Sequence, residues 1–336
     1  MNELQIVQSR GEIVAQQTVG NGRKLQFTVF TPTYNRAHTL PRLYESLKKQ
    51  TFKDFEWVIV DDGSVDDTRE IVFGWIGESA FPIRYFYQEN SGKHVAINRG
   101  VEEANGEFFL IVDSDDWLVP DALEKLKRYW DKIPGEVKPY IAGVIGLDQD
   151  PSGGLIGTPY PKDELLSDIV EIYYNLGVKG DKSGFYKTAV LREFPFPVFR
   201  GEKFIPESIV WNRIAEHYKC LFINEIIAVR DYQPDGLTRR SWVHAMNSPC
   251  GMKSSLLQVL TLKRKLPLFA VFRRTVSYAR FSFHCGMGIV AQSREVKEKA
   301  PHRYLLWFLG WILGFGLYLL DKIKLRKFNK KRCETG

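Results

Sequence analysis

A chain of 336 residues, 44% hydrophobic and 26% charged, is long enough for one large or two moderate domains and is not composed like a disordered protein. Its net charge of +7 is concentrated near the C-terminus, where seven of the residues from 322 to 332 are Lys or Arg. The four cysteines lie at least 30 positions apart, which argues against a Cys-x-x-Cys zinc site and a disulfide framework, and we expect a reduced, cytosolic compartment. The N-terminus has neither a basic start nor an apolar core, so no secretory signal is expected.

Strands and helices are predicted to alternate from residue 25 onward. Short apolar runs predict strands at 26–31, 55–60, 83–87 and 107–112. Helical patterns lie between them, at 39–50, 66–76, 95–103 and 120–130. This alternation with short connections is typical of a parallel, doubly wound sheet, which binds ligands at the carboxyl ends of its strands.

The flanking regions are less regular. Residues 1–24 are polar and weakly patterned, and we expect a flexible or accessory extension there. Residues 136–240 are punctuated by Gly and Pro and should continue the sheet, with a strand at 226–230 and loops that shape a second binding site. The mixed apolar and basic pattern of 241–302 predicts helices.

The first predicted strand ends in the hexapeptide Thr-Pro-Thr-Tyr-Asn-Arg, residues 31–36. Pro32 and the small polar residues end the strand, and Tyr34 follows where a nucleotide base could stack on its ring. The bland alternative is an ordinary turn between a strand and a helix.

The second predicted strand ends in Asp61-Asp62-Gly63-Ser64. A single carboxylate here could cap the next helix, but two adjacent ones at the end of a buried strand repel each other. Donor groups on a base or ribose would favour the pair, and Gly63 permits a tight turn.

Three carboxylates follow the fourth predicted strand, at Asp113, Asp115 and Asp116. Their repulsion in a partly buried place would be costly without a cation, and Mg²⁺ or Mn²⁺ commonly bridges such carboxylates to substrate phosphates. The alternative is a solvated acidic turn that caps the following helix.

Residues 88–94 open the third predicted helix. The backbone amides near Asn90 and the Lys93 side chain could bind phosphate or ribose oxygens, because helix N-termini favour anions. We expect His94 to be a local hydrogen-bonding residue rather than a metal ligand.

Together these motifs resemble glycosyltransferase family 2 in their order and spacing over residues 26–130. The matching stretches are 31–36, 50–56, 60–64, 96–100, 104–108 and 113–116. The resemblance implies the α/β GT-A fold, in which flanking helices cover a mixed, mostly parallel sheet. A helical extension would follow at the C-terminus.

The resemblance also implies inversion at the anomeric carbon and a set of residue roles. Thr31, Pro32 and Tyr34 would frame the nucleotide, and Asp62 would contact its base. Asp113 would face the ribose or the metal ion, while Asp115 would hold Mg²⁺ or Mn²⁺ on the donor diphosphate.

An inverting transfer needs a carboxylate base for the acceptor hydroxyl. In the resembled family this base lies a few residues before an aromatic on a helix, which corresponds to Glu207 before Trp211. Many members have Asp here, Glu202 is a rival, and Glu207 could simply start the helix. Tyr232, Asp235 and Arg239 form either a diphosphate or acceptor loop or a plain surface loop.

Residues 304–320 are uncharged and apolar and precede the basic run of 322–332. This combination favours an anionic membrane surface over nucleic acid, with a buried core helix as the alternative. Nucleotide sugars and basic flanks both belong on the cytoplasmic side. We therefore prefer a peripheral or re-entrant helix and keep a true span as second choice.

The sequence thus predicts a GT-A catalytic domain at 25–240, with a nucleotide-sugar half at 25–130 and an acceptor half at 131–240. A membrane-associating segment is expected at 303–336. The predicted activity is transfer from a UDP-sugar to a glycan or lipid-linked acceptor in polysaccharide synthesis. The alternatives are a nucleotide-sugar-binding scaffold without catalysis and a metal-dependent nucleotidyltransferase, although the chain has no G-x-x-x-x-G-K loop.

Overall fold

The computed structural model describes residues 4–9, 12–17, 25–233 and 241–334. The chain forms two compact units, of which the first combines Met1–Phe196 with Ile214–Arg240 and the second combines Pro197–Arg213 with Ser241–Gly336. The second unit therefore takes a segment that the sequence analysis assigns to the acceptor half of the catalytic domain.

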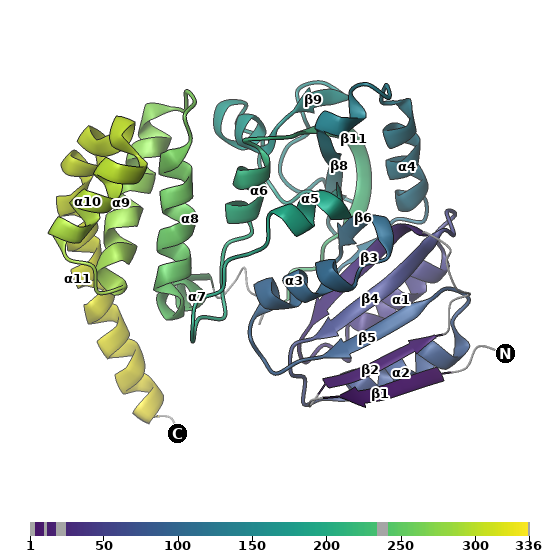
Figure 1. Cartoon of the computed structure of the whole chain (residues 1–336). Coiled ribbons are helices and arrows are strands. Elements are labelled where there is room, and N and C mark those ends of the chain that lie inside the picture. The colour runs from purple at the N-terminus through teal and green to yellow at the C-terminus, as the bar shows by residue number, and fades with distance from the viewer. Residues whose placement is uncertain (1–3, 10–11, 18–24, 234–240, 335–336) are drawn as a thin grey trace. The chain divides into compact units, whose positions relative to one another are not determined.

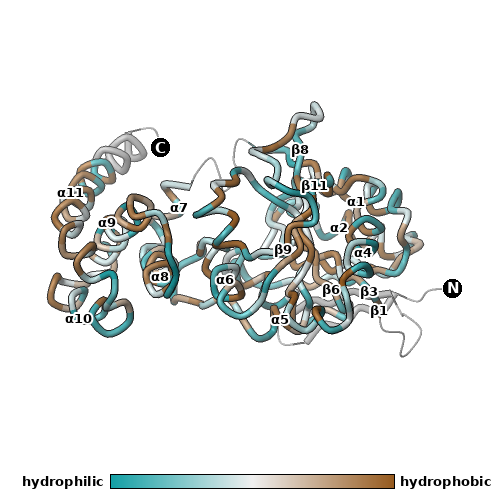
Figure 2. The backbone as a smooth tube through the Cα atoms, turned by 90° about the horizontal axis from the view of Figure 1, so that it is seen from above, coloured by the Kyte–Doolittle hydropathy of each residue, from teal (hydrophilic) through white to brown (hydrophobic). Residues whose placement is uncertain are grey.

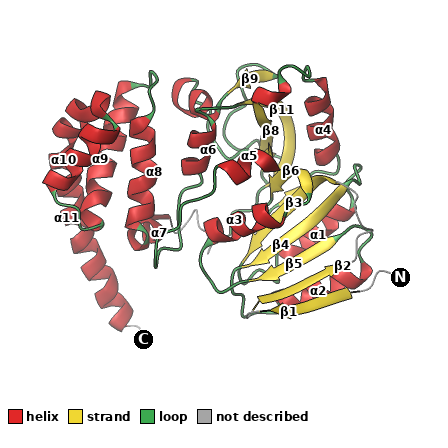
Figure 3. Ribbon diagram, viewed as in Figure 1, coloured by secondary structure: helices red, strands yellow, loops and turns green. Residues whose placement is uncertain are grey.

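The first unit is built on one mixed sheet with the strand order β1-β2-β5-β4-β3-β6-β10-β8-β11-β7 (Figures 1 and 3). The four predicted strands are confirmed as its parallel centre, namely β3 (Leu25–Thr33), β4 (Phe55–Asp61), β5 (Ile83–Tyr87) and β6 (Gly106–Ile111). The others are β1 (Leu4–Ser9), β2 (Glu12–Gln17), β7 (Trp117–Leu118), β8 (Ile141–Gln149), β9 (Leu165–Ser167), β10 (Gly184–Lys187) and β11 (Lys219–Val229). Antiparallel β10 separates β6 from β8, and β8 pairs with β11 in parallel.

Helices cover both faces of the sheet (Figure 1). On one face α1 (Leu40–Lys48), α2 (Thr68–Glu78) and α4 (Ala122–Lys132) enclose an aromatic core. On the other lie α3 (Lys93–Glu103) and α5 (Thr188–Glu193). A Cβ atom at Gly100 would lie 2.1 Å from the Phe30 ring, so glycine allows α3 to approach the sheet closely.

The N-terminal segment is part of the sheet. β1 and β2 form an antiparallel hairpin, and β2 pairs with β5 at the sheet edge. The sequence predicts no strands there because its polar pattern lacks the apolar run of a strand buried on both faces.

The second unit is helical and has its own apolar core. Its helices are α6 (Ser208–Ile214), α7 (Ser241–Asn247), α8 (Pro249–Thr261), α9 (Leu268–His284), α10 (Ile289–Lys299) and α11 (Tyr304–Glu334). A short helical turn lies at Pro301–Arg303, and the first unit has two more, at Lys138–Tyr140 and Glu171–Asn175. Among the described residues, one helical stretch, 301–326, is long and apolar enough to cross a membrane.

Glu56 on β4 is fully buried and holds the first unit together through hydrogen bonds. Its carboxylate accepts the Thr28 hydroxyl at 2.7 Å and the backbone N–H of Asn105 at 2.7 Å. The Arg84 guanidinium lies 3.5 Å from its other oxygen. Two of the family-like stretches, 50–56 and 104–108, therefore meet in a buried network that stabilises the fold.

We predict that Glu56→Ala lowers the free energy of unfolding by about 3 kcal/mol, because the donors that it satisfies remain buried without a partner. Denaturant unfolding monitored by circular dichroism measures the change. Glu45→Ala, at an exposed ion pair of α1, is the matched control and should change stability by about 0.5 kcal/mol or less. An equal effect of both substitutions would contradict the proposed network.

Candidate active site

The loop after β3 presents Tyr34 at the carboxyl edge of the sheet. Thr31 and Pro32 are buried, whereas the Tyr34 side chain is 48% exposed. The Thr31 hydroxyl accepts a hydrogen bond from the Trp57 indole N–H at 2.9 Å. Of the three residues predicted to frame a nucleotide, Tyr34 is therefore the one with an accessible side chain.

The loops after β3 and β4 are fastened to each other. The Asn35 N–H donates to the Ser64 hydroxyl at 2.8 Å, and its side-chain carbonyl accepts the Val65 N–H at 2.9 Å. Asp66 accepts the Ala37 N–H at 3.0 Å. These bonds fix the position of Tyr34 relative to the pair Asp61-Asp62.

The Asp62 carboxylate organises the start of α3. It is buried and accepts the backbone N–H groups of Ser91 and Gly92, each at 2.8 Å, and the Gln88 amide at 2.8 Å. Hydrogen-bond donors of the protein itself therefore stabilise this carboxylate, a role that the sequence suggested for donor groups on a base or ribose. A contact between Asp62 and the base stays a prediction.

Gly63 allows the β4 loop to approach the loop before α3. Its φ is +89°, and a Cβ atom there would lie 2.8 Å from the Asn90 nitrogen. Any other residue would strain the backbone and push Asn90 away. The predicted tight turn therefore brings Asn90 to the same edge as Asp62.

The acidic turn 113–116 follows β6. The Asp116 N–H donates to the Asp113 carbonyl at 3.0 Å, which closes the turn. The Lys93 ammonium at the start of α3 lies 2.7 Å from Asp113. Two consecutive residues, Gly92 and Lys93, therefore join Asp62 to Asp113.

Arg230, directly after β11, binds the other side of the acidic turn. Its guanidinium lies 2.9 Å from Asp116 and 3.5 Å from Asp113, and it contacts buried Asp148 of β8 at 2.5 Å. Neither Arg230 nor Asp148 is among the site residues predicted from the sequence. A charged residue at the end of an apolar strand is the sequence pattern that could have indicated them, as it did for Asp113.

The charges of this cluster are unbalanced. Burial of Asp113 opposes its negative charge, but Lys93 and Arg230 outweigh this effect and lower the pKa of Asp113. Burial raises the pKa of Asp115, and repulsion from Asp113 adds to it. Burial also raises the pKa of Asp116, because the attraction of Arg230 does not offset it. The cluster therefore favours an additional cation.

His94 differs from its expected role. Its side chain is 2% exposed, and within the described residues neither ring nitrogen has a hydrogen-bond partner. Burial lowers the pKa of the imidazole, which favours the neutral form. The expectation of a local hydrogen-bonding role is wrong for this structure.

Known proteins match the chain in sequence. The family model described as Glycosyl transferase family 2 matches residues 28–138. Glycosyltransferase GlyA of Streptococcus pneumoniae is 39% identical over 249 residues, which are 69% of this chain and 34% of GlyA. The match places residues 28–138 of the chain in glycosyltransferase family 2.

A second curated relative in this family is a GalNAc(5)-diNAcBac-PP-undecaprenol beta-1,3-glucosyltransferase of Campylobacter jejuni. It is 36% identical over 105 residues, which are 31% of this chain and 34% of that protein. The chain thus spans about a third of the length of both relatives.

Two solved structures confirm the GT-A fold. TarS 1–349 of S. aureus in complex with UDP-GlcNAc has a TM-score of 0.59 at 18% identity, covering 90% of this chain and 92% of TarS 1–349. The mannosyltransferase PcManGT of Pyrobaculum calidifontis, in complex with GDP-Man and Mn²⁺, has a TM-score of 0.51 at 18% identity, covering 89% and 88%.

A divalent metal ion held by Asp115 stays a prediction. Within the described residues no group of three or more His, Cys, Asp or Glu is arranged to hold a metal ion. One or two carboxylates suffice for Mg²⁺ when substrate phosphates supply other ligands. Asp115 makes no ion pair in the described part of the chain and has a raised pKa, whereas Asp113 already pairs with Lys93 and Arg230.

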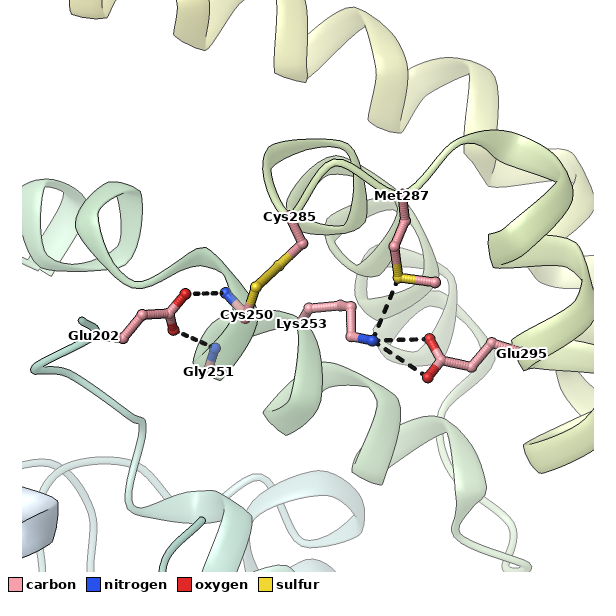
Figure 4. The surroundings of a disulfide bond; sticks show 7 residues. All are labelled: Glu202, Cys250, Gly251, Lys253, Cys285, Met287 and Glu295. Carbon is pink, nitrogen blue, oxygen red and sulfur yellow. Dashed lines mark hydrogen bonds and ion pairs between the residues drawn. A yellow bond between two sulfur atoms is a disulfide. The ribbon is translucent and has the colours of Figure 1, made fainter. Parts of the chain in front are cut away.

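The two candidate bases belong to the second unit. Glu207 precedes α6, and its backbone carbonyl accepts the N–H groups of Val210 and Trp211 in the first turn. Glu202 accepts the N–H groups of Cys250 and Gly251, at 2.8 and 2.7 Å, at the start of α8 (Figure 4). Both Glu202 oxygens cap the start of α8, and the choice of Glu207 over Glu202 as the base stays a prediction.

The structure joins Cys250 at the start of α8 to Cys285 after α9 in a disulfide (Figure 4). The sequence analysis expected no disulfide, because 35 positions separate the two residues and spacing alone does not reveal the pairing. The bond crosslinks the two helices next to the Glu202 cap.

We predict that Asp115→Asn abolishes the extra thermal stabilisation that Mn²⁺ gives in the presence of a UDP-sugar, because it removes the carboxylate of the turn that makes no ion pair in the described residues. Differential scanning fluorimetry with and without EDTA measures the effect. Asp131→Asn, at an exposed pair on α4, is the control and should keep it. Full Mn²⁺-dependent stabilisation of Asp115→Asn would contradict this assignment.

Glu202→Ala should lower the free energy of unfolding by about 1–2 kcal/mol, the usual effect of losing a helix cap. Glu202→Gln retains one acceptor oxygen and should lower it by less. Thermal unfolding of the three proteins tests the cap. Equal stability of Glu202→Ala and the parent chain would exclude it.

Proposed function

We propose that the chain transfers a sugar from a nucleotide-sugar donor to a hydroxyl of a glycan or lipid-linked acceptor in polysaccharide synthesis. The observation that carries the proposal is the acidic turn after β6, which needs a cation and lies beside Lys93 at the N-terminus of α3. TarS and PcManGT, which share the fold, are solved with UDP-GlcNAc and GDP-Man. We favour UDP because it is common in the resembled family.

The nucleotide would bind at the edge formed by the loops after β3, β4 and β5. Tyr34 is exposed there and offers a ring for stacking on the base. Asp62 would meet the base with its remaining acceptor capacity, and its hydrogen bonds hold the loop that carries Asn90 and Lys93 in place. Thr31 and Pro32 would contribute by fixing the end of β3.

The diphosphate would lie against the acidic turn. Asp115, with Asp113 nearby, would hold a divalent ion, which would supply positive charge for the leaving diphosphate oxygens. Lys93 adds a second positive charge and is kept in place by Asp113. Arg230 and Lys93 together hold the Asp113 side of the turn, which leaves the Asp115 carboxylate for the ion.

The transfer would invert the anomeric carbon in one displacement. The Glu207 carboxylate takes the proton of the acceptor hydroxyl while its oxygen bonds to the anomeric carbon. The bond from that carbon to the diphosphate oxygen breaks, and the nucleoside diphosphate leaves with the bonding electrons. A one-step inverting displacement needs no second carboxylate as a nucleophile on the donor side.

A lipid-linked acceptor would place the protein at the cytoplasmic side of the membrane. The C. jejuni relative is named as a glucosyltransferase that acts on an undecaprenol-linked glycan. The apolar stretch 301–326 offers a means of attachment. Charged donors remain in the cytosol, so attachment on that side brings both substrates together.

We predict that Glu207→Gln reduces turnover at least ~100-fold while the affinity for the UDP-sugar stays unchanged, because the base acts on the acceptor alone. Steady-state kinetics with calorimetric donor titration measures both quantities. Glu202→Gln is the matched comparison and should keep turnover close to that of the parent chain. The reverse result would assign the base to Glu202.

A further inference from the structure

One face of α11 is fastened to α9 along its apolar half. Trp307 is buried, and Gly310 and Gly314 bring the two helices close together. A Cβ atom at Gly314 would lie 2.6 Å from the Ala279 Cβ, and one at Gly310 would lie 3.0 Å from the Thr275 hydroxyl. Such small-residue contacts allow tight helix packing without a polar interface.

A buried ion pair continues this contact beyond the glycines. Asp321 of α11 is 3% exposed and receives hydrogen bonds from Arg280 at 2.6 Å and from His284 at 3.0 Å. Although burial opposes its charge, these partners lower the pKa of Asp321. Separation of α11 from α9 would leave buried charges without partners.

The opposite face of α11 is an apolar surface, which we name the outer stripe. Its members recur at helical spacing and are each between 51% and 68% exposed: Leu305, Phe308, Leu309, Ile312, Leu313, Leu320 and Ile323. The hydropathy colouring of α11 shows the same apolar character (Figure 2). A continuous exposed apolar surface of this length marks an interaction site.

Exposed cations extend α11 beyond the apolar stretch. Lys322, Lys324 and Arg326 are exposed on the helix next to Leu320 and Ile323 of the outer stripe. An apolar face next to a run of cations complements acyl chains and anionic headgroups at once. This charge pattern favours a lipid surface over a second copy of the same basic chain.

Attachment to α9 argues against a span. If α11 crossed a bilayer, α9 would have to enter the bilayer beside it and carry Arg273, Arg274 and Arg280 with it. Otherwise the buried contacts between α9 and α11 would break. Both events are costly, because arginine is unfavourable at the bilayer centre. We propose that α11 lies in the plane of an anionic bilayer, with the outer stripe in the acyl boundary and its cations on the headgroups. This rests on the proposed membrane attachment and defines its geometry.

Flotation of the full chain with vesicles tests the surface. Phosphatidylglycerol vesicles should bind the chain, and Leu309→Glu/Ile312→Glu should abolish binding. Val198→Glu, at a residue 61% exposed in the same unit, is the matched control and should bind normally. Replacing Lys322, Lys324 and Arg326 with Gln should weaken binding on the order of 100-fold, since each cation near an anionic surface contributes independently.

Labelling of the helix flanks distinguishes the interface from a span. In a Cys333→Ser background, Lys299→Cys and Lys324→Cys should both react with a membrane-impermeant maleimide added outside sealed vesicles. Protection of only one flank would show a span and overturn the proposal. Normal vesicle binding by the outer-stripe variant would also overturn the proposal. So would a parent chain that forms a stable dimer in buffer and does not bind vesicles, if the outer-stripe substitutions dissociate that dimer.

The readouts separate this inference from the proposed enzymatic function. The outer-stripe variant should still transfer sugar to a water-soluble acceptor, because the residues proposed to bind the nucleotide sugar lie in the first unit. If transfer is absent from the parent chain while vesicle binding obeys the predictions, the glycosyltransferase proposal fails and the membrane geometry stands.

Discussion

The imbalance of charge at the carboxyl ends of β6, β8 and β11 is the constraint on which the rest of the first unit depends. Among the described residues, ion pairs bring two cations, Lys93 and Arg230, to Asp113, Asp116 and Asp148. Asp115 makes no such pair, and the attraction of Arg36 does not prevent the rise of its pKa. Burial makes this arrangement costly unless further positive charge arrives. A divalent ion with a diphosphate meets that need, because the ion adds charge and the diphosphate supplies its other oxygen ligands.

The first turn of α3 turns separate strand ends into one site. Asp62 holds the N–H groups that precede this turn, and Lys93 reaches Asp113 from the next residue. Displacement of the loop would remove the Gly92 N–H from Asp62 and the Lys93 ammonium from Asp113. These contacts organise the site before the nucleotide sugar binds. Such preorganisation suits a reaction whose barrier depends on charge that develops on the leaving group.

The sequence was sufficient for the elements whose burial is complete, because strands such as Phe55–Asp61 show their position through apolar residues alone. It was insufficient where partners are distant in the chain. Arg230 lies 114 positions from Asp116 and 82 from Asp148, so no local pattern could join them. It also could not tell that the Thr31 hydroxyl faces Trp57, because side-chain direction depends on strand register. The β1–β2 hairpin was missed because pairing at a sheet edge requires no apolar run.

The helical unit gives the two proposals a common physical basis. The segment that carries Glu207 is fastened to α8 by the Glu202 cap, and the Cys250–Cys285 disulfide joins α8 to α9. Because α9 in turn holds α11, the proposed base and the outer stripe belong to one packed unit. A unit bound flat on a bilayer would then keep Glu207 at a fixed height above the lipid headgroups.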